Sequence, residues 1–184
     1  MTRPLRNGRL AVIDMQVCFQ EDTSQWHVPR YDEAAVNVQR LSAAFAGRVM
    51  WTKFVRDSAE PGAWSDYYDR WSSFRVDENS RQWDLTLDPL ADDPVIALPT
   101  FSKWGSELAT WAPFEDPLVV CGVATDCCVL STVLGAVDAG RSTIVVTDAC
   151  AALSDAAQEQ TLQVLGLLSP MVTLATTDEV LGAG

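Results

Sequence analysis

Basic side chains are scarce in this 184-residue chain, which has 13 Lys and Arg residues against 25 Asp and Glu residues and a formal net charge of −12. Nucleic-acid binding requires clustered positive charge, so this balance argues against a nucleic-acid partner. Lysine occurs only at Lys53 and Lys103, and histidine only at His27. Any cysteine–histidine dyad would therefore have to use His27.

Long apolar runs are also missing. The amino-terminal stretch MTRPLRNGRLAVIDMQ has an apolar run of four residues before Asp14, which is too short for a signal peptide. No window approaches the ~18 apolar residues of a membrane span. We therefore expect a cytoplasmic protein with no membrane partner. Free thiols are then expected at all five cysteines: Cys18, Cys121, Cys127, Cys128 and Cys150.

Short apolar runs alternate with helical stretches along the chain. Strands are expected at residues 9–15, 48–55, 93–99, 116–124, 142–149 and 171–176. Helices are expected at residues 32–46, 128–140 and 154–169, the last with Ser154 as its N-cap. Continuous apolar strands separated by helices indicate a parallel sheet covered on both faces. The predicted fold is one α/β domain over residues 1–184, a three-layer α/β/α Rossmann-like sandwich with six parallel strands in the order 3-2-1-4-5-6.

One long connection, residues 57–92, interrupts this alternation. It is rich in tryptophan, tyrosine and arginine, and it is too aromatic for a disordered linker. Loops of this length in compact domains usually have a function, so the segment is interpreted as a lid or a subunit contact. The alternative is a set of extra helices that only cover the edge of the sheet.

Chemically active side chains follow three of the predicted strands. Asp14 ends the first strand, Lys103 follows the third, and the cluster CGVATDCC follows the fourth. Sites in open α/β sheets form at the carboxyl ends of strands, so a carboxylate, an amine and a thiol could meet in one crevice. A free thiol with a pKa of about 8.5 is mostly protonated at neutral pH. An active cysteine would therefore need a nearby cation or a helix amino terminus.

Five segments, LAVIDMQVCF, PTFSKW, GVATDCCVLST, VVTDACAA and VTLATTDEVL, together resemble the isochorismatase-like cysteine hydrolase superfamily. The resemblance extends over nearly the whole chain and implies a catalytic triad of Asp14, Lys103 and Cys128. The family pattern G-[VI]-x-T-x-x-C ends at Cys128, which leaves Cys127 at a variable position. Adjacent cysteines without a CxxC motif are a poor metal site, and a vicinal disulfide would strain the backbone.

The resemblance also implies a cis peptide bond between Val123 and Ala124. This bond turns the Ala124 amide toward the nucleophile, and the amides of Ala124 and Cys128 would form an oxyanion hole. The implied activity is hydrolysis of the C–N bond of a small amide, ureido or carbamoyl compound through a thioester on Cys128. Asp14 would accept the thiol proton and later return it to the leaving nitrogen.

Departures from the family pattern narrow this function. Nicotinamidases of the family bind a metal through a D-x-H motif and a further histidine after the second strand, where this chain has TKFVRDSAEPG without histidine. Metal-dependent nicotinamidase activity is therefore not expected, and neither a metal nor another cofactor is predicted. True isochorismatases, which cleave a vinyl ether, usually lack the cysteine, so Cys128 favours amide hydrolysis. A vinyl ether hydrolase and a non-catalytic or redox-responsive member stay open as alternatives. The usual QNDF sequence is QVCF here, at residues 16–19.

The substrate pocket is predicted from closeness to these motifs. Phe19 and Trp104 follow the motifs directly, whereas Trp64 and Arg75 belong to the connection 57–92. An arginine there could bind a substrate carboxylate through two hydrogen bonds. The expected pocket residues are Gln16, Phe19, Trp64, Arg75, Trp104 and Thr125, and a contribution from Cys18 is left open. The resemblance further implies a homodimer or homotetramer that acts on a small molecule.

Overall fold

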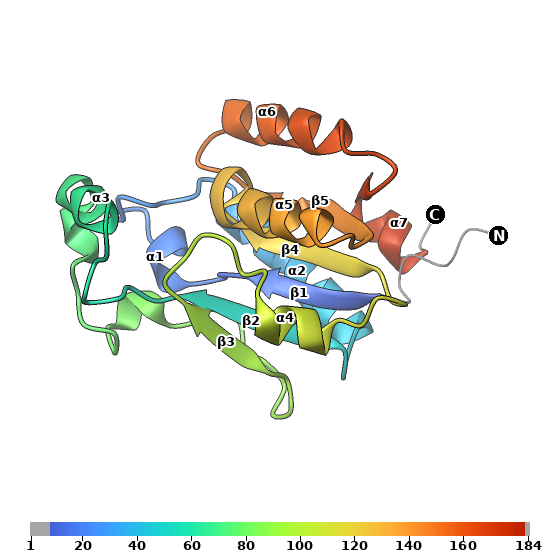
Figure 1. The fold of residues 1–184 in the computed structure, drawn as a ribbon, viewed down its shortest axis with the longest axis horizontal. Coiled ribbons are helices and arrows are strands. Elements are labelled where there is room, and N and C mark those ends of the chain that lie inside the picture. Colours follow the sequence, from blue (N-terminus) through green and yellow to red (C-terminus); the bar gives the residue numbers. More distant parts are fainter. Residues whose placement is uncertain (1–7, 183–184) are drawn as a thin grey trace.

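The computed structural model describes residues 8–182, and its centre is a six-stranded parallel sheet (Figure 1). The strands are β1 (Arg9–Ile13), β2 (Val49–Phe54), β3 (Val95–Leu98), β4 (Leu118–Val123), β5 (Thr143–Ala151) and β6 (Val172–Ala175). Their order in the sheet is β3-β2-β1-β4-β5-β6, and all five neighbouring pairs are parallel. The predicted strand order is confirmed.

Helices cover both faces of this sheet. They are α1 (Val17–Gln20), α2 (Tyr31–Ala44), α3 (Trp64–Arg70), α4 (Ser106–Trp111), α5 (Leu130–Asp138), α6 (Asp155–Gly166) and α7 (Thr177–Leu181). Figure 1 shows α4 and α5 in front of the strands and α2 behind them, as a three-layer sandwich requires. None of the helices within residues 8–182 is both long enough and apolar enough to cross a bilayer.

The element boundaries differ from the predictions where the backbone changes conformation. β1 ends at Ile13 because Asp14 has a positive φ of 48°. The helix expected from residue 128 is preceded by a π-helical turn, η4 (Thr125–Val129), so the helical segment begins three residues earlier. The expected N-cap of α6 is confirmed, since the Ser154 hydroxyl accepts a hydrogen bond from the Ala157 amide at 3.1 Å.

The connection 57–92 folds into α3 and two short 3₁₀ helices, η2 (Ser72–Phe74) and η3 (Arg81–Trp83). Aromatic packing fixes it to the rest of the domain: the rings of Trp26 and Phe74 stack with centroids 3.7 Å apart. In Figure 1, α3 lies beyond the carboxyl ends of the strands, on the opposite side of the molecule from the two termini. This aromatic segment therefore lies at the edge of the sheet where the sequence predicts the site.

Candidate active site

Asp14 lies at the carboxyl end of β1, in the centre of the sheet, and is fully buried. Its carboxylate Oδ1 accepts a hydrogen bond of 2.6 Å from the Thr52 hydroxyl on β2, and its amide donates to the same hydroxyl oxygen at 3.2 Å. Thr52 thus fixes both the backbone and the side chain of Asp14. A positive φ in a residue other than glycine costs about 1–3 kcal/mol and occurs mostly where the surrounding structure enforces it.

Lys103 is the partner of this carboxylate. Its ammonium lies 3.1 Å from Asp14 Oδ2, and neither side chain is exposed. The ammonium also donates to the Thr100 carbonyl at 2.8 Å and lies 4.9 Å from the centroid of the Phe54 ring. The contact with Asp14 is an ion pair without hydrogen-bond alignment, so Oδ2 receives no hydrogen bond. This oxygen is therefore the one that could accept a proton.

Gly122 allows β4 to pass unusually close to β1 beside Asp14. It has a φ of +113°, and a Cβ atom at this position would lie 2.1 Å from the Ile13 carbonyl oxygen. Only a residue without a side chain fits there. The close approach brings the η4 turn, which follows β4, next to the end of β1.

Cys128 lies in the η4 turn and is 3% exposed. The expected cis peptide bond between Val123 and Ala124 is present immediately before this turn. The interaction with the Cys127 side chain, burial and the Asp14 carboxylate raise the pKa of the Cys128 thiol well above its usual range. Lys103 lowers this pKa, as the sequence suggested for a cation, but it is outweighed. The resting group is therefore a neutral thiol, not a preformed thiolate.

Thr132 on α5 connects Lys103 to Cys128. Its buried hydroxyl accepts a hydrogen bond of 2.8 Å from the Lys103 amide and donates one of 2.7 Å to the Cys128 carbonyl. One turn further along α5, a Cβ atom on Gly135 would lie 3.0 Å from Trp104 Cβ, so the loop around Lys103 packs tightly on the helix. The helix that follows the cysteine thus also positions the lysine.

A small cavity of about 40 Å³ opens beside the sulfur, large enough for water but smaller than a typical ligand pocket. We call it the Cys128 cavity. It is lined by Phe19, Trp26, Phe54, Tyr67, Phe101, Ala124, Cys127, Cys128 and Leu153. Of the six pocket residues expected from the sequence, only Phe19 is in this set.

Two of the other expected pocket residues have structural contacts instead. The Gln16 amide donates to the carbonyls of Phe54 and Trp83 at 2.9 and 2.8 Å and accepts from the Phe54 amide at 2.8 Å, so no polar atom is left for a substrate. Trp104 packs against Gly135 of α5, and the Arg141 guanidinium lies 6.0 Å from the centroid of its ring.

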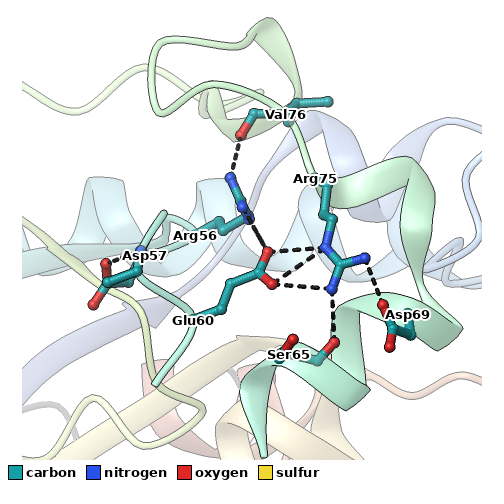
Figure 2. A network of polar contacts seen from close by, with 8 residues as sticks. Arg56, Asp57, Glu60, Ser65, Asp69, Arg75 and Val76 are labelled. Carbon is teal, nitrogen blue, oxygen red and sulfur yellow. Dashed lines mark hydrogen bonds and ion pairs between the residues drawn. The ribbon is translucent and has the colours of Figure 1, made fainter. Parts of the chain in front are cut away.

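The arginine in the connection 57–92 is not placed for a substrate carboxylate either. Figure 2 shows the Arg75 guanidinium held by Glu60, Asp69 and the Ser65 carbonyl, with shortest contacts of 3.0, 2.6 and 2.8 Å. Arg56 binds the same Glu60 carboxylate from the other side. These charges are paired among themselves, and Arg75 does not line the Cys128 cavity.

Two expected positions, Trp64 and Thr125, are not among the residues that line the cavity, and neither is Cys18, for which the sequence leaves a contribution open. The Trp64 ring lies 4.9 Å from the ring of Phe101 and forms a second layer behind the wall. Thr125 is buried with no hydrogen-bond partner for its hydroxyl. Cys18 is 1% exposed, and burial, followed by the charge of Asp14, raises the pKa of its thiol.

Sequence patterns point to some of the other residues that line the Cys128 cavity. Phe101 lies in the PTFSKW segment, and Tyr67 lies in the aromatic connection. Leu153 comes directly after the VVTDACAA segment, whereas Trp26 follows no motif. Only the packing of distant segments brings both residues to the cavity. Among residues 8–182, no group of three or more His, Cys, Asp or Glu side chains could hold a metal ion, so the residues present do not fit a metal centre.

The site thus combines a buried carboxylate–ammonium pair with a buried cysteine at the carboxyl edge of the central strands of a parallel α/β sandwich. The sequence model described as the isochorismatase domain matches residues 10–179. The chain therefore belongs to the isochorismatase family of cysteine hydrolases.

Solved structures share this fold. A cysteine hydrolase from Pseudomonas syringae pv. phaseolicola has a TM-score of 0.82 and 23% identity, covering 100% of this chain and 96% of that one. A pyrazinamidase of Pyrococcus horikoshii in complex with zinc has a TM-score of 0.76 and 20% identity, covering 92% and 99%. The N-carbamoylsarcosine amidase from Thermoplasma acidophilum has a TM-score of 0.69 and 21% identity, covering 92% and 96%. At these identities the likeness concerns the fold alone.

Proposed function

We propose that this protein hydrolyses the C–N bond of a small amide, ureido or carbamoyl compound through a thioester on Cys128. The observation that carries the proposal is the fully buried Asp14–Lys103 pair, which leaves Asp14 Oδ2 without a hydrogen-bond donor beside a neutral thiol. A protonated cysteine needs a base at the moment of attack, and this carboxylate oxygen is a base held in place.

In the proposed reaction, the Cys128 proton moves to Asp14 Oδ2 as the sulfur attacks the substrate carbonyl carbon. The amides of Ala124 and Cys128 hold the resulting oxyanion. When the C–N bond breaks, Asp14 returns the proton to the departing nitrogen, and a thioester remains. Asp14 then takes a proton from water, whose oxygen attacks the thioester, and the sulfur leaves and regains the proton. Lys103 keeps its charge throughout and balances the negative charge that Asp14 and Cys128 share.

A panel of amide, ureido and carbamoyl compounds tests the proposal by ammonia release. Each compound that proves to be a substrate is then mixed afresh with the protein. The reaction is quenched early, and the intact mass of the protein is measured. The expected result is a mass increase equal to the acyl group less the one hydrogen atom that it replaces, located on the peptide that contains Cys128. Turnover without any acylated cysteine would contradict the thioester, and cleavage of a vinyl ether in place of amides would favour the isochorismatase-type reaction.

The neutral thiol predicts a distinctive pH dependence for alkylation of Cys128. Because its pKa is raised, the thiolate fraction is small at neutral pH and grows as pH increases. The iodoacetamide labelling rate should rise about tenfold per pH unit from about pH 6 to pH 9 without a plateau. Peptide mapping at each pH measures this rate, and a plateau below about pH 7 would instead show a preformed thiolate.

Thr132 connects the Lys103 loop to Cys128, so Thr132→Val is expected to lower kcat about 10- to 100-fold. A misplacement of active-site groups near 1 Å has an effect of this size. The variant also leaves the Lys103 amide without its acceptor, at a cost of about 1–3 kcal/mol in the free energy of unfolding. Thr132→Ser retains the hydroxyl and should recover most of both losses. Steady-state kinetics and urea unfolding measure the effects. Reduced stability with normal kcat in Thr132→Val would limit the residue to a structural role.

A further inference from the structure

The buried Lys103 ammonium has more hydrogen-bond donors than acceptors around it within the described chain. It carries three N–H groups. One donates to the Thr100 carbonyl at 2.8 Å, whereas the ion pair with Asp14 Oδ2 at 3.1 Å is not aligned as a hydrogen bond. The side chain is fully buried, so bulk water does not make up the difference. A buried charge that lacks hydrogen bonds needs another source of stabilisation.

The ring of Phe54 supplies this stabilisation. Lys103 Nζ lies 4.9 Å from the ring centroid, within the range of about 6 Å over which the negative face of a ring attracts a cation. Among the cation–ring contacts of residues 8–182, this is the one in which both side chains are buried, with exposed fractions of 0% and 1%. Such contacts are strongest where water is excluded. The ring is therefore part of the electrostatics of the site.

Both the backbone and the ring of Phe54 are held in place. The Gln16 side-chain oxygen accepts a hydrogen bond of 2.8 Å from the Phe54 amide, and its nitrogen donates one of 2.9 Å to the Phe54 carbonyl. The ring meets Trp26 edge to face, with centroids 5.5 Å apart, and stacks on Phe101 at 6.2 Å. The ring face is thus presented to the ammonium by the fold itself.

Phe54 contacts both the ammonium and the Cys128 cavity, whereas Lys103 does not line that cavity. Lys103 nevertheless acts on the nucleophile, because its charge lowers the pKa of the Cys128 thiol against the larger effects that raise it. The lysine therefore works through its charge, and the size of that effect depends on where Nζ is held.

We propose that Phe54 is a positioning residue, whose ring face holds the Lys103 ammonium beside Asp14 so that the lysine acts on Cys128 through its charge without touching the substrate. The consequence for turnover rests on the proposed function, but the placement of the ammonium does not depend on any substrate. The proposal gives an electrostatic role to a residue that would otherwise be only an apolar wall of the cavity.

Stepwise fluorination of the Phe54 ring tests this inference, since each fluorine weakens the negative face of the ring while the side chain keeps nearly the same shape. Phenylalanine with one, two or three fluorine atoms is introduced at position 54, and the rate of Cys128 labelling by iodoacetamide is measured at one pH by peptide mapping. The rate should fall with each fluorine, by at least about threefold in total, because a loosely held ammonium lowers the pKa of the thiol less. Equal rates across the series would overturn the inference.

Two controls separate the effect on the cation from a change in shape. Phe101 lines the same cavity and stacks on Phe54, but the ammonium lies over the ring of Phe54, so the same series at position 101 should leave the labelling rate level. The second control repeats the Phe54 series in Lys103→Met, where no ammonium remains, and should also be level. A decline in either control as steep as in the parent series would show a steric effect and overturn the inference.

Turnover of an accepted amide distinguishes this inference from the proposed function. Across the Phe54 series kcat should fall at least about threefold while KM changes less than about twofold, because the ammonium does not touch the substrate. A change confined to KM, or a constant kcat with an acyl group trapped on Cys128, would overturn the role of Phe54 and leave the thioester reaction supported. A declining labelling rate without turnover of any amide would support the placement of the ammonium by Phe54 and contradict the proposed function.

Discussion

Cys128→Ala is expected to reduce hydrolysis of any accepted amide by at least about 10⁴-fold, because removal of a nucleophile typically has effects of this size or larger. The alanine retains the oxyanion-hole amides and the Asp14–Lys103 pair. Substrate binding should therefore persist while the chemical step is lost. Ammonia release under single-turnover conditions measures the chemical step, and calorimetric titration of the variant with the same amide measures binding.

Cys127→Ala is the matched control for this substitution, since it removes the adjacent sulfur from the same cavity. It should keep at least a tenth of the turnover. The variant should also lower the pKa of the Cys128 thiol, because the Cys127 side chain contributes most to raising it. Loss of all activity in Cys127→Ala, with activity retained in Cys128→Ala, would reverse the assignment of the nucleophile.

Lys103→Met is expected to lower the free energy of unfolding by about 3–5 kcal/mol, the usual result of removing one partner from a buried ion pair. Both side chains are fully buried, so the Asp14 carboxylate would keep only its hydrogen bond with Thr52. Methionine fills similar space without the charge. Urea unfolding monitored by tryptophan fluorescence measures the loss.

The double variant Asp14→Asn/Lys103→Met gives the control for this effect. Asparagine tolerates the positive φ at position 14, so the double variant removes both charges with little change in shape. It should recover at least half of the stability lost in Lys103→Met, although both variants should be inactive. Asp14→Asn alone completes the cycle: if its loss and that of Lys103→Met simply add in the double variant, the ion pair does not couple the two residues.

The sheet could be predicted from the sequence because its strands are continuous apolar runs separated by amphipathic helices. This pattern is a local property of the chain, and the handedness of the crossovers then restricts the strand order. The positions of Asp14, Lys103 and Cys128 after three strands place them at one edge for the same reason. The Asp14–Lys103 contact follows directly from this arrangement.

The cavity walls could not be predicted in this way. The connection 57–92 has no long periodic element, and its shape depends on ring stacking and on ion pairs such as Glu60 with Arg75. Gln16 follows a motif closely, yet its amide satisfies backbone groups of two separate segments. Closeness in sequence to a motif therefore indicated which residues are buried at this edge, but not which ones face the sulfur.

The buried ion pair also has a consequence for how the protein responds to salt. Carboxylate, ammonium and thiol carry no net charge together, and transfer of the Cys128 proton to Asp14 leaves that sum unchanged. Salt ions screen exposed charges over about 10 Å at ~0.1 M, but they act far less on buried ones. The chemical step is therefore insulated from ionic strength. The net charge of −12 still surrounds the molecule, and salt screens it, so only the arrival of charged reagents should change.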